Sequence, residues 1–145
     1  GVSGDTTAGG VRRIKWLMKH APEVVILELG ANDGLRGLSL KEMESNLEQI
    51  IGVCEEGGAK VLLTGMKAPP NYGEEYTVEF EKVFFRLAEK NNLSFVPFFL
   101  EGVAGVREHT QSDGIHPLES GYSIVVETIW KYLKPLMDAG SKTKA

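Results

Sequence analysis

The stretch VVILELG, at residues 24–30, decides the fold class of this chain of 145 residues. It is a short apolar run with β-branched members, preceded by Pro22 and closed by Gly30. Such a run is typical of a strand that is buried on both faces of a parallel sheet. Two similar runs follow at residues 60–64 and 93–97. The sequence therefore predicts three strands of one parallel sheet.

Helical patterns lie before, between and after these runs. Apolar residues recur at helical spacing in the segments 11–18, 40–51, 78–87 and 122–133. Ser39 can cap the second of these helices, and Glu42 would complete a capping box. We expect the last helix to stop at Pro135. Strands that alternate with helices of this length predict an α/β fold with a parallel sheet.

The bulk properties favour one globular domain, which we place at residues 1–137, before a flexible tail at 138–145. A net charge of −4 gives no reason to expect a nucleic-acid partner, which calls for a clustered basic surface. No apolar run approaches the roughly 20 residues that a membrane-spanning helix needs, so no membrane span is expected. Cys54 is the only cysteine, which excludes an intrachain disulfide, and we interpret it as a packed core residue.

The loops at 1–7 and 30–34 are candidates for a binding site. In parallel sheets, sites form at the carboxyl ends of strands, where the loop at 30–34 lies. The Asn32 amide there can donate hydrogen bonds, as an oxyanion hole requires, or can simply help to close a turn. The loop at 1–7 leads into the first helix. Gly4 allows close approach of a ligand to the backbone, although the polar residues after it could simply cap the helix.

The segment DGIHP, at residues 113–117, carries the clearest chemistry. It places a carboxylate and an imidazole three residues apart on a turn that contains glycine and proline. Asp113 can fix the tautomer of the ring and stabilise the imidazolium, and His116 can act as a general base. We assign His20 to a helix end and His109 to a polar loop, without a catalytic role. A general base serves a nucleophile, and the chain offers no obvious one.

Five segments together resemble the SGNH (GDSL) hydrolases, in the branch of bacterial thioesterase I, lysophospholipase L1 and related arylesterases. The matching segments are VSGDTT (2–7), ELGANDGLRG (28–37), PPNYG (69–73), PFF (97–99) and DGIHP (113–117). They occur in the order of the family, and the resemblance covers nearly the whole chain. The resemblance implies a flavodoxin-like, three-layer αβα fold with a parallel sheet. It also implies a serine ester hydrolase of the carboxylesterase, arylesterase, acyl thioesterase or lysophospholipase type.

The resemblance further implies roles for single residues. Gly4 would donate its backbone N–H and Asn32 its side-chain amide to the oxyanion hole, with His116 as general base and Asp113 as its partner. Loop 68–72 would form one wall of the acyl groove, and loop 35–38 would shift on substrate binding. The substrate-binding residues would be Gly30, Pro69, Asn71, Tyr72 and Ile115. No metal or cofactor is required, the substrate would be a small acyl ester or thioester, and the protein would be periplasmic or secreted.

One departure from the family pattern matters for function. The family takes its nucleophilic serine from a Gly-Asp-Ser motif that does not occur here. The segment at 4–9 resembles a degenerate form of it, with Thr6 as nucleophile, but lies too close to Asn32 for that role. We therefore expect an N-terminal segment with the motif to be supplied by the same polypeptide, by a cleaved peptide or by a second copy. Its strand would lie beside 24–29, and without it this chain would be inactive and would not fold stably.

Two other classes of function stay open at this point. The first is a catalytically inactive SGNH-like domain that binds acyl or carbohydrate ligands, since the chain carries no nucleophile motif. The second is a flavodoxin-like nucleotide or flavin binder, although no Gly-rich phosphate loop supports it.

Overall fold

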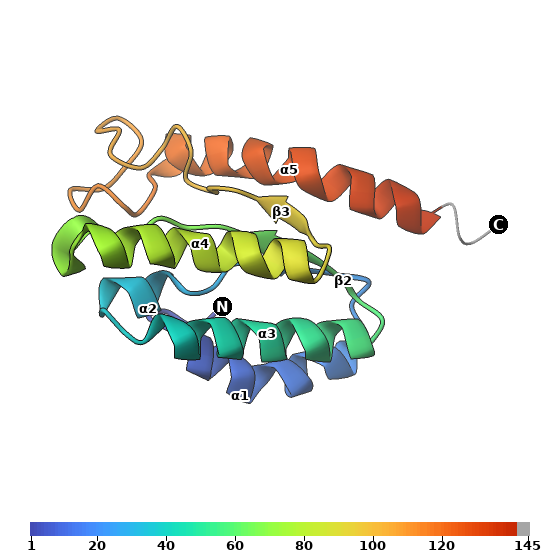
Figure 1. The fold of residues 1–145 in the computed structure, drawn as a ribbon. Helices are drawn as coiled ribbons and strands as arrows, with labels where there is room; N and C mark the ends of the chain where they lie inside the picture. Colours follow the sequence, from blue (N-terminus) through green and yellow to red (C-terminus); the bar gives the residue numbers. More distant parts are fainter. Residues whose placement is uncertain (142–145) are drawn as a thin grey trace. The chain divides into compact units, whose positions relative to one another are not determined.

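The computed structural model describes residues 1–141. The chain divides into two compact units, Gly1–Pro97 and Phe98–Ala145, which are described separately below. In Figure 1 the first unit runs from blue to yellow and the second is orange to red. The predicted domain limits at 137 and 138 stay a prediction.

The first unit is built on a three-stranded parallel sheet. Its strands are β1 (Val24–Leu27), β2 (Lys60–Thr64) and β3 (Ser94–Val96), in the order β1-β2-β3. They coincide with the three apolar runs of the sequence, and the register pairs Val25 with Val61 and Leu63 with Phe95. The predicted α/β fold with a parallel sheet is therefore confirmed.

Helices cover this sheet. The unit contains α1 (Thr7–Leu17), the 3₁₀ turn η1 (Met18–His20), α2 (Ala31–Leu35), α3 (Leu40–Glu56), the 3₁₀ turn η2 (Pro70–Tyr72) and α4 (Glu74–Lys90). Because α3 and α4 join successive parallel strands, right-handed crossovers place both on the same face, where they contact β2 (Figure 1). α1 packs on α3.

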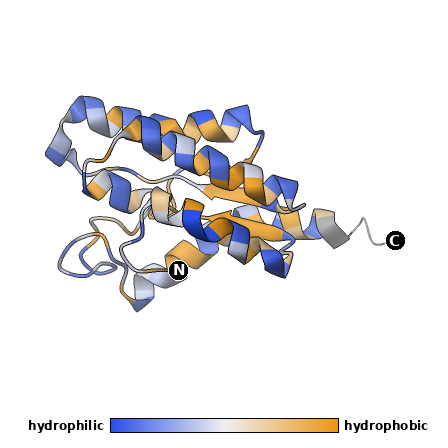
Figure 2. Cartoon of the chain, turned by 90° about the horizontal axis from the view of Figure 1, so that it is seen from below, coloured by the Kyte–Doolittle hydropathy of each residue, from blue (hydrophilic) through white to orange (hydrophobic). Residues whose placement is uncertain are grey.

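The core of the first unit lies between this helical layer and the sheet. Figure 2 shows the apolar strands and the apolar stripes of the helices in orange. Fully buried members of the core include Met43, Leu47, Ile50, Phe80 and Phe84. Cys54 belongs to the same core, as predicted, and burial raises the pKa of its thiol.

The start of α3 follows the predicted cap. The Ser39 hydroxyl oxygen accepts a hydrogen bond from the Glu42 backbone N–H at 3.3 Å. This bond satisfies one of the backbone donors that a helix start leaves without an intrahelical partner.

β1 is the edge strand of the described sheet. Val25 and Leu27 face the helical layer, whereas Ile26 points to the opposite face and is 41% exposed. The prediction that this run is buried on both faces is therefore wrong for the described residues, since Ile26 on the face opposite the helical layer is exposed. Among the described residues, no strand pairs with the outer edge of β1. An apolar edge of this kind invites pairing with a further strand.

The second unit consists of a long loop followed by α5 (Glu119–Ser141). The predicted stop at Pro135 is wrong, since the proline lies inside the helix. A proline within a helix removes one backbone hydrogen bond and strains the preceding turn, but the turns on both sides can continue. The helix extends through residue 141, and residues 142–145 of the predicted flexible tail lie outside the described part.

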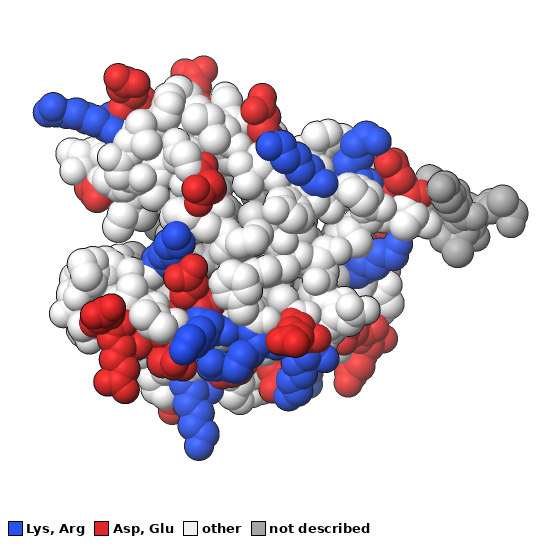
Figure 3. Space-filling view, turned by 45° about the horizontal axis from the view of Figure 1, so that its top comes forward, with Lys and Arg blue, Asp and Glu red and all other residues white. Residues whose placement is uncertain are grey.

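Charged side chains of both signs are mixed on the face shown in Figure 3. Pairs join neighbouring helices of the first unit, as where Arg86 of α4 contacts Glu44 of α3 at 2.8 Å. Among residues 1–141, no helix combines the length and apolar character needed to cross a bilayer.

Candidate active site

The two predicted oxyanion donors lie on segments that are bonded to each other. Gly4 adopts a left-handed conformation with φ 71°, in the exposed loop before α1. The Asn32 side-chain amide donates to the carbonyl oxygen of Asp5 at 2.9 Å. Arg36 Nη2 donates to the carbonyl oxygen of Gly4 at 2.8 Å. Two side chains from the segment after β1 therefore hold the loop that carries Gly4.

The bond to Asp5 orients the amide of Asn32. A primary amide has two N–H donors, and one N–H of Asn32 donates to the Asp5 carbonyl. Because the amide is planar, this bond fixes the direction of the second N–H, and Asn32 is half-buried. Among the described residues, the bond to Asp5 is the one hydrogen bond of this amide, so its second N–H has no acceptor there.

The segment at 30–34 differs from the predicted tight loop, because it forms the start of the short helix α2. Gly30 precedes the helix with φ 115°, a conformation that favours glycine, and an added Cβ would lie 3.1 Å from the Phe84 ring. The Gly34 N–H donates to the Gly30 carbonyl at 3.1 Å, which closes the first turn. Asn32 therefore sits on a hydrogen-bonded helical turn rather than on a free loop.

The second unit brings Asp113 and His116 into direct contact. Asp113 Oδ2 lies 2.5 Å from His116 Nδ1. Its Oδ1 accepts from the backbone N–H groups of Ile115 at 2.9 Å and of His116 at 3.0 Å. These bonds, led by the one to the imidazole, lower the pKa of Asp113 from 3.8 to about 2.

This contact determines the tautomer of the neutral ring. An ionised carboxylate can only accept, so Nδ1 carries the proton and Nε2 presents a free lone pair. The side chain of His116 is 63% exposed. The pair therefore has the protonation pattern that a general base needs.

Backbone bonds within the second unit hold the turn that carries this pair. Gln111 N–H donates to the His116 carbonyl at 2.8 Å, and Gly105 N–H donates to the Gly114 carbonyl at 2.9 Å. Gly114 has φ 71°, which favours glycine at this position.

The residues predicted to line the acyl groove belong to the first unit and lie around η2. Pro69 is half-buried, and Asn71 and Tyr72 are exposed. The Tyr72 hydroxyl donates to the Leu35 carbonyl at 3.4 Å. A Cβ on Gly37 would meet the Tyr72 ring at 2.5 Å, so the loops at 35–38 and 68–72 are in contact.

The predicted site residues are thus divided between the two units. The first unit holds Gly4, Gly30, Asn32, Pro69, Asn71 and Tyr72, and the second holds Asp113, Ile115 and His116. Their catalytic and binding roles stay predictions.

Sequence reasoning missed a buried polar network behind Asn32. Asp33 is 3% exposed and accepts two hydrogen bonds from Thr7, at 2.9 Å from its backbone N–H and at 2.6 Å from its hydroxyl. The Asn46 amide donates to the same hydroxyl at 3.1 Å. Thr6, at the N-cap of α1, makes no side-chain capping bond. No local pattern signals this network, because its partners lie far apart in the sequence.

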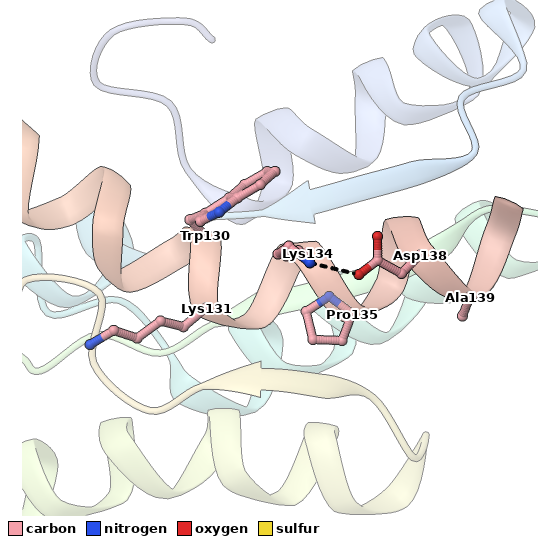
Figure 4. A pocket seen from close by; sticks show the side chains of 6 residues that line it. All are labelled: Trp130, Lys131, Lys134, Pro135, Asp138 and Ala139. Atoms are coloured by element: carbon pink, nitrogen blue, oxygen red, sulfur yellow. Dashed lines mark hydrogen bonds and ion pairs between the residues drawn. The ribbon is translucent and has the colours of Figure 1, made fainter.

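Other surface features do not contribute to this site. A hollow on α5 is lined by Trp130, Lys131, Lys134, Pro135, Asp138 and Ala139, with an ion pair of 3.0 Å between Lys134 and Asp138 (Figure 4). It contains none of the predicted site residues. Within residues 1–141, no group of three or more His, Cys, Asp or Glu side chains is placed to hold a metal ion.

Comparison with known proteins gives the same family as the sequence motifs. The model of the GDSL-like Lipase/Acylhydrolase family matches residues 1–124. The chain is 44% identical over 137 residues to Esterase TesA of Pseudomonas aeruginosa, which covers 94% of this chain and 68% of that protein. It is 36% identical over 141 residues to the thioesterase 1/protease 1/lysophospholipase L1 of Escherichia coli strain K12, covering 97% and 68%.

A solved structure supports the fold. The crystal structure of TesA matches with a TM-score of 0.88 at 44% identity, covering 92% of this chain and 75% of that one. The chain spans about two thirds of the length of the two curated relatives. The chain therefore belongs to the GDSL-like lipase/acylhydrolase family, the SGNH hydrolases that its five sequence motifs resemble.

Proposed function

We propose that the protein is a serine ester hydrolase that acts through an acyl-enzyme, with its nucleophilic serine on a segment outside this chain. The observation that carries the proposal is the contact between the Asp113 carboxylate and His116 Nδ1, which leaves Nε2 free as a base. The names of the relatives, an esterase and a thioesterase/lysophospholipase, support the same class of reaction.

In the proposed mechanism, His116 Nε2 takes the proton of the serine hydroxyl as the serine oxygen attacks the carbonyl carbon of the substrate. The resulting imidazolium gives this proton to the leaving alkoxide or thiolate, and the acyl-enzyme forms. In the second half of the reaction, His116 takes a proton from a water molecule as the water attacks the acyl-enzyme. The imidazolium then returns this proton to the serine oxygen, and the carboxylic acid is released. Asp113 stays ionised throughout, because its pKa of about 2 is far below neutral pH.

Charge develops on the carbonyl oxygen in each tetrahedral intermediate. The Gly4 N–H and the free N–H of Asn32 are proposed to donate to this oxygen. The bonds from Asn32 to Asp5 and from Arg36 to Gly4 support this role, because they orient both donors before the substrate arrives.

The proposed nucleophile segment would add a strand to the outer edge of β1. The position of the apolar strand β1 at the edge of the described sheet supports this, since an apolar edge gains stability from pairing. The segment would come from the same polypeptide, from a cleaved peptide or from a second copy.

Small acyl esters and thioesters are the proposed substrates, because both react through the same tetrahedral intermediate. A periplasmic or extracellular location is proposed from the family resemblance, and cell fractionation would test it.

The direct test is a denaturing mass spectrum of the purified protein after treatment with a fluorophosphonate probe. We expect an adduct on a serine outside these 145 residues. An unlabelled chain of 15.9 kDa alone would favour the alternative, an inactive domain that binds acyl or carbohydrate ligands. An adduct within this chain, at Ser3 or Thr6, would refute the assignment of the nucleophile.

Replacing Asn32 with Ala should lower kcat for ester hydrolysis by about 10²- to 10³-fold, the usual loss for one oxyanion donor. KM should change little, because the bond forms mainly in the transition state. Steady-state kinetics of the active protein would measure both constants. Asn91→Ala is the matched control, since the Asn91 amide caps α4 by donating to the Leu87 carbonyl. Equal effects of the two substitutions would exclude an oxyanion role for Asn32.

A further inference from the structure

We infer that Asp33 is a positioning residue of the oxyanion hole, which holds the Gly4 and Asn32 donors in register through its two bonds to Thr7. This inference rests on the proposed function. Among the described residues, Asp33 is the only buried acidic side chain, and the proposed chemical steps do not use it.

The carboxylate is fully engaged by one partner. Both of its oxygens accept from Thr7, at 2.9 Å and 2.6 Å, and Thr7 itself is completely buried. Asn46 donates to the Thr7 hydroxyl from α3. Burying a carboxylate is costly unless hydrogen bonds compensate it. The arrangement is therefore rigid, because movement of either residue would leave a buried polar group unpaired.

The position of Thr7 explains why a carboxylate is favoured. Thr7 is the first residue of α1, and its N–H is one of the donors that a helix start leaves without an intrahelical partner. The N-cap residue Thr6 provides no side-chain acceptor. Asp33 therefore caps α1 from a distant part of the chain, and its negative charge is stabilised by the helix dipole.

This distant cap joins the two segments that carry the proposed donors. Gly4 lies three residues before Thr7, and Asn32 lies directly before Asp33. A shift of α1 relative to α2 would move the Gly4 N–H away from the Asn32 amide. Misplacement of a catalytic group by about 1 Å can cost about 10²-fold in rate.

The other bonds between these segments are less protected. Arg36, which donates to the Gly4 carbonyl, is exposed, and Asn32, which donates to the Asp5 carbonyl, is itself a proposed donor. Exposed hydrogen bonds compete with water and contribute less than buried ones. The buried bonds of Asp33 are therefore the ones that set the distance between the segments.

The experiment compares Asp33→Asn, Thr7→Val and Thr7→Ser in the active protein, with a short-chain p-nitrophenyl ester as substrate. We expect Asp33→Asn to lower kcat by about 10- to 100-fold with KM within about threefold. Thr7→Val removes both bonds of the Thr7 hydroxyl, the one to Asp33 and the one from Asn46, and should lower kcat by about 10-fold. Thr7→Ser keeps the hydroxyl, and its kcat should remain within about threefold of the parental kcat.

A double-mutant cycle with Asn32→Ala separates positioning from a general structural role. If Asp33 acts through the oxyanion hole, Asp33→Asn should cost less than about threefold once Asn32 is gone. If the kcat losses of Asp33→Asn and Asn32→Ala multiply in full in the double mutant, the inference is overturned. Parental kcat in Asp33→Asn would also overturn it, as would an equal loss of kcat in Thr7→Ser and Thr7→Val. If Asp33→Asn does not fold, the comparison of kcat between Thr7→Val and Thr7→Ser tests the inference. An inactive parent protein without a probe adduct would instead refute the proposed function and, with it, this inference.

Discussion

Replacing His116 with Ala is expected to lower kcat for ester hydrolysis by about 10⁴-fold or more. The substitution removes the lone pair at Nε2, which is proposed to take the proton of the nucleophile. The remaining oxyanion donors would sustain only a residual rate above that of water. Steady-state hydrolysis of a short-chain p-nitrophenyl ester would measure the loss, and the rate of fluorophosphonate labelling should fall with it, since labelling also requires an activated serine.

His20→Ala is the matched control for this substitution. His20 ends η1 and lies with its ring edge-on to Trp16 at a centroid distance of 5.5 Å, and it has no proposed catalytic role. The control should keep parental activity and labelling. An active His116→Ala variant would show that His116 is not the base.

Replacing Asp113 with Asn should also lower kcat by about 10⁴-fold. The carboxylate accepts the Nδ1 proton and stabilises the imidazolium, whereas an amide carries no charge and no longer requires that tautomer. Because the pKa of Asp113 is about 2, the loss should be similar at every pH from about 4 to 9. Profiles of kcat against pH for the parent and the variant would check this.

The sign of the pH effect on stability follows from the same shift. The folded protein lowers the pKa of Asp113 below its ordinary 3.8, so the stabilising contribution is present above that pH. This contribution to stability is lost as the pH falls from 3.8 toward 2.

Asp138→Asn, an exposed change on α5, is the control for Asp113→Asn and should leave kcat unchanged. A variant of Asp113 with parental kcat would contradict the proposed pair.

Local chemistry made much of the fold predictable. The apolar, partly β-branched runs coincide with β1, β2 and β3, because period and composition reflect burial directly. The Ser39 cap and the Asp113–His116 contact were predictable for a related reason. Their partners lie three residues apart, so a single turn brings them together whatever the rest of the chain does.

Non-local packing decided what the sequence patterns missed. Pro135 was expected to end the last helix, but the turns that flank it continue α5. Ile26 was expected to be buried but is exposed, because its burial depends on what packs on that face of β1 and not on the apolar run itself. The segment at 30–34 is a helical turn closed by the bond from the Gly34 N–H to the Gly30 carbonyl, and a side chain at Gly30 would contact the Phe84 ring tightly.

By itself, the sequence determined the parallel α/β fold, the family and the contact between Asp113 and His116, since each depends on short-range periodicity, on short motifs or on residues a turn apart. Only the tertiary structure decided how the segments that carry the proposed oxyanion donors are held together. The bonds between Asp33 and Thr7 span 26 residues of sequence. No periodic pattern encodes a contact at that distance, because it arises only when α1 and α2 pack around the same buried polar group.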